Sequence, residues 1–376
     1  MGIQGMKYLI LGVSNAGLFI ARQLRKQWPN CMIYAVGDIQ DIGRYSNVID
    51  RFYGAHSSEE IIDSITHAYT DMGKGEVNAY MCSNPMLELV VLKHPEIFDY
   101  LKFDNPVEVY QKLVDKVQTE QLCRSLKITR PEEYCLTDIS NGAIAFPVVV
   151  KPLEKRLAIG ASKCAYLADQ DHLESYLVKM DSLGIDRNCL VCQQLVEGDN
   201  RWEYGYGGYF INGEASVDIC FHQFKQVPQG LCCYSREMTD AELADKIKML
   251  VKPLLIDLKY NGFIEFDIKQ DVNTKELYLL DVNPRPWRSV DMLTVKLDGS
   301  TVFSPTVCEK KAVWRYRYRE LFSKKNKRNV SYKDCKSITG TTNFVCHNTL
   351  YDKSDIEPMR QQSKQDLKDL IKKIVK

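Results

Sequence analysis

The sequence lacks the long apolar run that a membrane span requires, since nowhere do about 18 apolar residues follow one another. It also lacks an excess of charge of one sign, with 50 basic and 49 acidic residues and a formal net charge of +1. A nucleic-acid footprint would need a clear basic excess. The N-terminus shows no signal-peptide pattern, and Met6 stands where a myristoylation motif needs serine or threonine. We therefore expect a cytoplasmic protein with no membrane span and no nucleic-acid partner.

Cysteine is frequent, but the paired motifs that mark structural zinc sites are missing. The chain has 13 cysteines. Only Cys189 and Cys192 have the Cys-x-x-Cys spacing, and they lie in an apolar, strand-like run. A zinc site of four ligands needs a second such pair. We interpret the cysteines as reduced and mostly buried small hydrophobic residues.

One stretch near the middle of the chain carries the strongest chemical pattern. Residues 262–268 and 277–288 are rich in aromatic and branched side chains, and the polar run 270–276 separates them. Such a pattern predicts a β-hairpin. With 376 residues and 45% apolar content, the chain is long enough for two or three domains with proper cores. The hairpin would then belong to the largest of them.

The hairpin arms carry acidic side chains at alternate positions. Because side chains alternate between the two faces of a strand, Glu265 and Asp267 share a face, and so do Asp281 and Asn283. With the turn centred on Asn273, Glu265 lies directly opposite Asp281. Two carboxylates across a ladder repel each other, and a hard cation between them removes that cost. Mg²⁺ prefers one or two carboxylates together with substrate phosphates, which predicts a metal site here.

Two arginines follow the second arm. Arg285 and Arg288 lie just past the predicted strand end, where guanidinium groups can bind phosphate or carboxylate. Pro284 and Pro286 bracket Arg285 and fix an extended exit, which an ordinary surface loop would not need. The alternative interpretation is an exposed hairpin whose polar residues face water.

The order Glu-Phe, hairpin turn and Asp-Val-Asn-Pro-Arg resembles the metal-binding end of the ATP-grasp superfamily. The resemblance is strongest to its carboxylate–amine ligase branch, which includes biotin carboxylase and the large subunit of carbamoyl phosphate synthetase. It implies that Glu265, Asp281 and Asn283 hold Mg²⁺, with Mn²⁺ as an alternative, on the phosphates of ATP. Arg285 would contact phosphate or substrate. The family more often has glutamate where Asp281 stands, and Asp281 is one methylene shorter.

The resemblance extends to the other motifs in family order. Lys116, within a predicted helix over 107–126, and Lys151, at the end of an apolar strand, would bind the phosphates. Residues 154–163 would form the loop over the triphosphate, and residues 188–199 the hinge that pairs with adenine. The residues that this assigns to the nucleotide are Lys116, Lys151, Gly160, Ser162, Lys163, Gln193, Gln194, Val196 and Asp199. Those that it assigns to catalysis are Arg285, Arg288 and Lys225, the last in a turn that resembles an Arg-x-x-Pro-x-x-Gly motif.

The implied fold class is α/β and α+β, an ATP-grasp fold preceded by a Rossmann-like domain. The expected domains are residues 1–105, 106–303 (subdomains 106–187 and 188–303) and a basic extension over 304–376. Near the N-terminus, Gly12 and Gly17 follow a strand, but the dinucleotide fingerprint needs three glycines. We favour substrate binding or packing over dinucleotide binding there.

The C-terminal extension is the least informative part. Residues 309–336 are strongly basic, and arginine alternates with tyrosine over 315–319, which fits an edge strand, a surface for an acidic partner or a solvated face. Residues 352–358 then precede a charged helix predicted over 362–375.

The sequence thus predicts an ATP- and Mg²⁺-dependent ligase. The carboxylate of a small molecule would attack the γ-phosphate, and an amine would displace phosphate from the acyl phosphate. Two alternatives stay open: a phosphotransferase on the same fold, and a nucleotide-binding regulatory protein with weak catalysis. Ligases of this kind are often dimers, so a homodimer is an open expectation.

Overall fold

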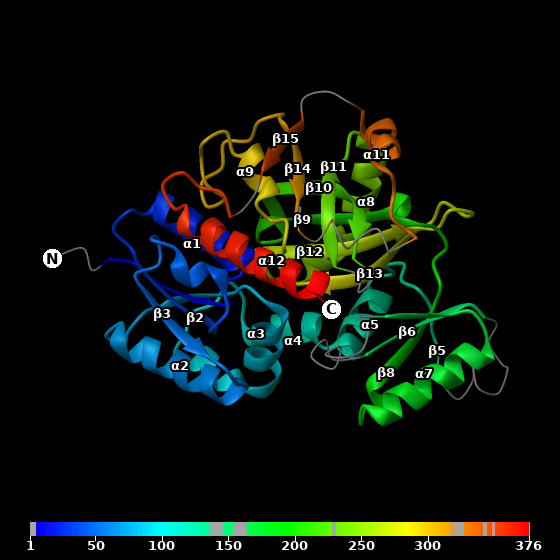
Figure 1. The fold of residues 1–376 in the computed structure, drawn as a ribbon, viewed down its shortest axis with the longest axis horizontal. Helices are drawn as coiled ribbons and strands as arrows, with labels where there is room; N and C mark the ends of the chain where they lie inside the picture. The colour runs from blue at the N-terminus through cyan, green and yellow to red at the C-terminus, as the bar shows by residue number, and fades with distance from the viewer. Residues whose placement is uncertain are drawn as a thin grey trace.

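The structure is a computed structural model. It describes residues 5–134, 136, 146–152, 164–227, 231–316, 318, 320, 327–340, 344–347 and 350–375. Figure 1 shows three units, each built around its own sheet, and the red C-terminal helix crosses in front of the N-terminal unit. No helix in these residue ranges is long and apolar enough to cross a membrane.

The N-terminal unit is a parallel sheet with the strand order β3-β2-β1-β4. The central strand over 7–11 is buried on both faces, which is typical of parallel sheets. The predicted small parallel sheet is therefore confirmed. The strands are β1 (Lys7–Leu11), β2 (Met32–Asp38), β3 (Arg51–Ala55) and β4 (Asn78–Met81). The helical segments are α1 (Asn15–Gln27), η1 (Ile42–Tyr45), α2 (Ser58–Asp71), α3 (Asn84–Glu88), η2 (Leu89–Lys93) and η3 (Pro95–Asp99).

The second unit is a smaller antiparallel sheet with the order β5-β8-β6-β7. Its strands are β5 (Glu133–Tyr134), β6 (Val148–Pro152), β7 (Ala165–Leu167) and β8 (Leu190–Gln194), and its helix is α7 (Gln170–Ser182). Since β8 pairs with β6 and β5, the smaller sheet continues past residue 187. The expected boundary at 187/188 therefore cuts this sheet before its last strand.

The helix predicted over 107–126 is two helices, α4 (Val107–Val114) and α5 (Lys116–Ser125). Asp115 lies between them with an extended backbone, and its side chain accepts hydrogen bonds from the amides of Val117 and Gln118. An aspartate in this position is an N-cap, which satisfies the first amides of α5. The prediction of one continuous helix is wrong because the cap competes with the helical conformation.

The third unit is a seven-stranded sheet with the order β13-β12-β9-β10-β11-β14-β15. Its strands are β9 (Glu203–Ile211), β10 (Glu214–Gln226), β11 (Cys232–Glu237), β12 (Gly262–Gln270), β13 (Leu277–Asn283), β14 (Lys311–Arg315) and β15 (Phe344–His347). The accompanying helices are α8 (Ala241–Asp257), α9 (Met292–Lys296) and α11 (Tyr332–Thr339), and α12 (Glu357–Val375) follows them along the chain. β14 and β15 belong to this sheet, so the region after residue 303 is not a separate extension.

One apolar core joins the N-terminal unit to the larger sheet. Phe19 of α1 packs edge-on against Phe263 of β12, with ring centroids 6.3 Å apart. Trp28 after α1 packs on Phe303, at 5.2 Å between ring centroids. Residues that follow the N-terminal strands, such as Asn84 after β4, also lie beside the β12–β13 hairpin.

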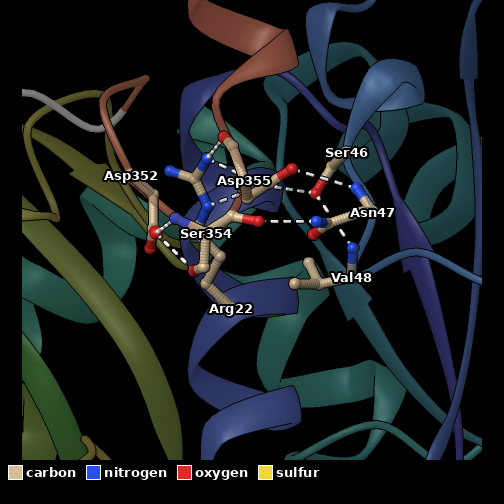
Figure 2. Close-up of polar contacts among 7 residues, drawn as sticks. All are labelled: Arg22, Ser46, Asn47, Val48, Asp352, Ser354 and Asp355. Atoms are coloured by element: carbon tan, nitrogen blue, oxygen red, sulfur yellow. Dashed lines mark hydrogen bonds and ion pairs between the residues drawn. The ribbon is translucent and has the colours of Figure 1, made fainter.

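The chain before α12 is anchored to the N-terminal unit by a buried carboxylate (Figure 2). The Asp355 carboxylate accepts from the guanidinium of Arg22 at 2.8 Å and from the hydroxyl of Ser46 at 2.6 Å. The amide of Asn47 donates to its second oxygen at 2.9 Å. The side chain of Asp355 is 1% exposed and that of Arg22 14% exposed. These bonds hold the start of α12 against α1 and η1.

Replacing Asp355 with alanine is expected to lower the free energy of unfolding by about 3 kcal/mol or more, because the largely buried guanidinium of Arg22 loses its ion pair and the hydroxyl of Ser46 loses its acceptor. Urea denaturation followed by circular dichroism measures this change. The control is Glu357→Gln, since the Glu357–Arg360 pair is exposed and spans 3.7 Å, and its loss should cost less than about 1 kcal/mol. A loss below about 1 kcal/mol for Asp355→Ala would contradict the anchoring role.

Candidate active site

The β12–β13 hairpin presents its acidic side chains in a different register from the one predicted. Glu265 pairs with Asn283, and Asp267 pairs with Asp281. The register shifts just beyond Asp267, so Leu280 is an extra residue on β13, a β-bulge. The expectation that Glu265 lies opposite Asp281 is therefore wrong. The alternation of faces still holds, and all four polar side chains lie on one face.

Asp267 also lies on this face, although the sequence predicted no role for it in the site. Its carboxylate accepts from Gln223 of β10 at 2.7 Å and from the amide of Asn283 at 3.2 Å. The alternation of side chains along a strand predicts that Asp267 shares a face with Glu265. The contribution of Gln223 had no sequence signal, because it depends on how β10 pairs with its neighbours.

This face opens into a cavity of about 1110 Å³ to which all three units contribute. The N-terminal unit supplies Ser14, Asn15, Asp41, Ser83 and Asn84. The smaller sheet supplies Lys151, Cys164 and Tyr166. The larger sheet supplies Glu203, Gln223, Glu265, Asp267, Asp281 and Asn283, and the chain after it supplies Arg285, Arg288, Lys327, Arg328 and Gln362. A pocket of this size can hold a nucleotide together with a small second ligand.

The two predicted phosphate-binding lysines both line this cavity. Lys116, the first residue of α5, donates to the carbonyl of Pro152. Lys151, on β6, reaches the carbonyl of the bulged residue Leu280 at 3.5 Å. Burial lowers the pKa of Lys151, and the nearby Asp281 carboxylate opposes this shift. The bulge thus brings a cation of the smaller sheet to the acidic face of the larger one.

Both predicted arginines line the cavity as well. Arg285 donates to the side chains of Asn84 and Asn283, the latter at 3.2 Å, and to the carbonyl of Pro286 at 2.9 Å. Burial lowers the pKa of Arg288, but an arginine stays protonated in proteins. Arg285 is thus fixed beside the acidic face, and Arg288 places a second positive charge in the cavity.

Lys225 does not line the cavity, contrary to its expected role in catalysis. The pairing of β10 with β11 shifts register between His222 and Gln226, and this irregularity changes which side chains face the cavity. The ammonium of Lys225 lies 3.2 Å from the ring centroid of Tyr332. Gln223 and Gln226 line the cavity in its place.

The predicted adenine hinge does not contribute its side chains to the cavity. Gln193 donates to Glu133 at 2.7 Å, and Gln194 accepts from the amide of Glu132 at 3.3 Å. Val196 is 4% exposed, and Asp199 pairs with Arg201 at 2.8 Å. These four residues are therefore absent from the cavity wall, and only a role for hinge backbone groups stays as a prediction. Gly160, Ser162 and Lys163 lie outside the described residues.

The oxygen ligands suit a magnesium ion only together with a nucleotide. In the described part of the chain, no group of three or more histidine, cysteine, aspartate or glutamate side chains is placed to hold a metal ion. Glu265, Asp281 and Asn283 offer carboxylate and amide oxygens on one face, which fits Mg²⁺ when phosphate oxygens complete its shell. We therefore expect metal binding to depend on the nucleotide.

The turn before α1 is held by a buried carboxylate at the cavity wall. Asp41 accepts from the amide of Val13 at 2.9 Å. Burial raises the pKa of Asp41 to about 6, while the bond from Val13 opposes this shift. A raised pKa in the folded state means that Asp41 contributes stability below about pH 4 that is lost as the pH rises through about 6.

Asp41→Asn is therefore expected to gain stability relative to the wild type between pH 4 and pH 7, by roughly 1–3 kcal/mol. The asparagine can still accept from the amide of Val13 without the cost of a buried charge. Urea denaturation of both proteins at several pH values measures the difference. A difference in stability that does not change with pH would contradict this assignment.

Known proteins resemble the chain in both sequence and structure. No family model matches the chain. The chain is 21% identical over 287 residues to D-aspartate ligase of Enterococcus faecium (strain Aus0004), covering 70% of this chain and 67% of that protein. It is 24% identical over 203 residues to D-alanine–D-alanine ligase B of Xanthomonas campestris pv. campestris, covering 49% of this chain and 59% of that protein.

Two solved structures share the fold at lower identity. The biotin carboxylase domain of the Hydrogenobacter thermophilus 2-oxoglutarate carboxylase, in complex with ADP, magnesium and bicarbonate, has a TM-score of 0.63 at 10% identity, covering 79% of this chain and 68% of that chain. The L-amino acid ligase of Bacillus licheniformis has a TM-score of 0.58 at 15% identity, covering 78% of this chain and 70% of that chain. The chain therefore has the ATP-grasp fold that its sequence predicts, and it resembles carboxylate–amine ligases that share this fold.

Proposed function

We propose that the chain is an ATP- and Mg²⁺-dependent ligase that joins a carboxylate to an amine through an acyl phosphate and releases ADP and phosphate. The main support for this proposal is that acidic and basic side chains line the same cavity. The acidic face of Glu265, Asp267 and Asp281 lies there with the cations Lys151 and Arg288. That combination suits a nucleotide–metal complex beside an anionic substrate.

Each group has a distinct task in the first step. Lys116 and Lys151 bind the phosphates, and Arg285 orients the γ-phosphate or the attacking carboxylate. Bound Mg²⁺ would neutralise charge on the phosphate oxygens. Little proton transfer is needed, because the attacking group is already a carboxylate, so positioning and charge stabilisation account for the rate enhancement. Glu203 lines the same cavity and accepts from Gln226, which makes it our candidate for a ribose contact.

The substrates that we propose are small molecules, an amino acid among them. D-Aspartate ligase and L-amino acid ligase are named for amino acids, and the chain resembles both. In the cavity, Arg288 would bind the carboxylate that reacts. The amide groups of Asn15 and Asn84 and the hydroxyl groups of Ser14 and Ser83 offer donors for the rest of the molecule. The homodimer and the cytoplasmic location remain predictions.

The test is release of ADP and phosphate from Mg-ATP with mixed pools of amino acids and small carboxylic acids. The ligase proposal expects release that needs both a carboxylate and an amine. Release with a single hydroxylated acceptor, together with a stable phosphorylated product, would favour the phosphotransferase. Tight binding of Mg-ATP with no turnover in any pool would favour the regulatory protein. Failure to bind Mg-ATP would refute the whole assignment.

A further inference from the structure

The short segment of residues 327–330, from the basic C-terminal region, lies across the predicted hinge. The amide of Asn200 donates to the carbonyl of Arg328 at 3.0 Å, and the guanidinium of Arg328 donates to the carbonyl of Gly198 at 2.5 Å. These two bonds connect the segment to the chain between β8 and β9. They hold the C-terminal end of the predicted hinge against the segment.

The same segment is bonded to the end of β10. The side chain of Asn329 accepts from the amide of Gln226 at 2.8 Å and donates to its carbonyl at 2.9 Å. The amide of Val330 donates to the carbonyl of Phe224 at 3.1 Å. Bonds on both sides therefore fix the segment between the hinge and the larger sheet.

Its two basic residues, Lys327 and Arg328, line the cavity together with Glu203. Both Arg328 and Lys151 lie near Cys164. The guanidinium carbon of Arg328 lies 4.3 Å from the ring centroid of Tyr166 on β7, a stacked arrangement. Tyr166 is 48% exposed, so its ring is available to the cavity.

We propose that the 327–330 segment is part of the nucleotide site, an inference that rests on the proposed function. Lys327 supplies a further cation to the polyphosphate of the nucleotide. Arg328 is a positioning residue that holds the hinge carbonyl of Gly198 and the ring of Tyr166 in place. The basic C-terminal region thus acts inside the molecule, through two of its residues, and is not only a solvated face.

The composition of the predicted phosphate loop supports this assignment. The stretch 154–163 contains Gly160 as its only glycine, although backbone amides of glycines are what usually cradle phosphates in such loops. Where a loop has few glycines to present backbone amides, lysine side chains can supply the positive charge that binds the phosphates. Lys327 is exposed and lines the cavity, so its flexible side chain can bring the ammonium to an anion there.

The test is calorimetric titration of the full chain with ATP, ADP, AMP and adenosine in the presence of Mg²⁺. Lys327→Ala is expected to weaken the binding of ATP and ADP roughly five- to tenfold, the effect of one charge-assisted contact, and to leave adenosine unchanged. The matched control is Lys333→Ala, which removes an exposed lysine of α11 that does not line the cavity. The control should bind all four ligands as the wild type does.

Arg328→Lys tests the positive charge of this side chain separately from its contacts with Tyr166 and Gly198. Lysine keeps the positive charge but loses the planar group that stacks on Tyr166 and bonds to Gly198. We expect weaker binding of adenosine as well as of ATP, because the hinge is no longer held. Near-ultraviolet circular dichroism checks that the variant folds.

The outcomes distinguish this inference from the proposed function. If the wild type binds Mg-ATP and Lys327→Ala binds ATP with unchanged affinity, the phosphate role of this segment is refuted while the ligase proposal stands. If Lys327→Ala weakens adenosine as much as ATP, the phosphate role is also wrong. If the wild type does not bind Mg-ATP, the proposed function fails first.

Discussion

Asp281→Asn lowers the rate of ADP release from Mg-ATP at least about a hundredfold, the loss typical of removing one group that stabilises transition-state charge. Asp281 lies opposite Asp267 on the acidic face and beside Lys151. Asparagine keeps the shape and removes the charge, so a metal–nucleotide complex loses one of its anionic ligands. Binding of Mn²⁺ in the presence of ATP, followed by electron paramagnetic resonance, should weaken in parallel.

The stability of this variant separates a functional role from a structural one. Asp281→Asn removes the repulsion between the opposed carboxylates of Asp267 and Asp281 but also the attraction between Asp281 and Lys151, so the free energy of unfolding without nucleotide should change by less than about 1 kcal/mol. The matched control is Glu276→Gln, an exposed carboxylate on the same hairpin that bonds to the hydroxyl of Tyr278 at 2.9 Å and does not line the cavity. Activity of Asp281→Asn within tenfold of the wild type would remove Asp281 from the site.

Arg288→Met raises the concentration of the carboxylate substrate needed for half-maximal ADP release about a hundredfold or more. The expected loss corresponds to a charge-assisted bidentate contact made by a largely buried guanidinium. The affinity for Mg-ATP should change less than threefold, because the proposed phosphate contacts come from Lys116, Lys151 and Arg285 rather than from Arg288. Steady-state kinetics and calorimetry measure the two effects independently.

A conservative variant of Arg288 tests whether the planar guanidinium group or only its positive charge is needed. Arg288→Lys keeps the charge but loses the planar fork, so a partial loss of about tenfold is expected. Equal losses of ATP and carboxylate binding in Arg288→Met would mean that the residue supports the fold of the cavity. The assignment to the carboxylate would then be wrong.

The hairpin illustrates which features the sequence could predict. The alternation of Glu265 with Asp267, and of Asp281 with Asn283, determines a shared face whatever the register. The register itself depended on the bulge at Leu280, and a count of residues around a symmetric turn cannot reveal an extra residue. The acidic face was therefore predicted correctly, and the pairing across it was wrong.

Other errors also arose from long-range contacts. Lys225 matched a family motif, but the irregular pairing of β10 with β11 leaves it against Tyr332. β14 gave no clear signal, because its place between β11 and β15 depends on tertiary pairing. The cap at Asp115 was readable in principle, since aspartate is a preferred N-cap. The sequence therefore predicted the fold family and the cations at strand ends, but it did not predict the role of the C-terminal region.

The most direct test of the central claim is the path of the carboxylate oxygen. The protein is incubated with Mg-ATP, an amine pool and amino acids labelled with ¹⁸O in the carboxylate, and the released phosphate is analysed by mass spectrometry. An acyl phosphate intermediate transfers one labelled oxygen from the carboxylate to the phosphate, so labelled phosphate is predicted in step with ADP. Release of ADP with only unlabelled phosphate would contradict the ligase account.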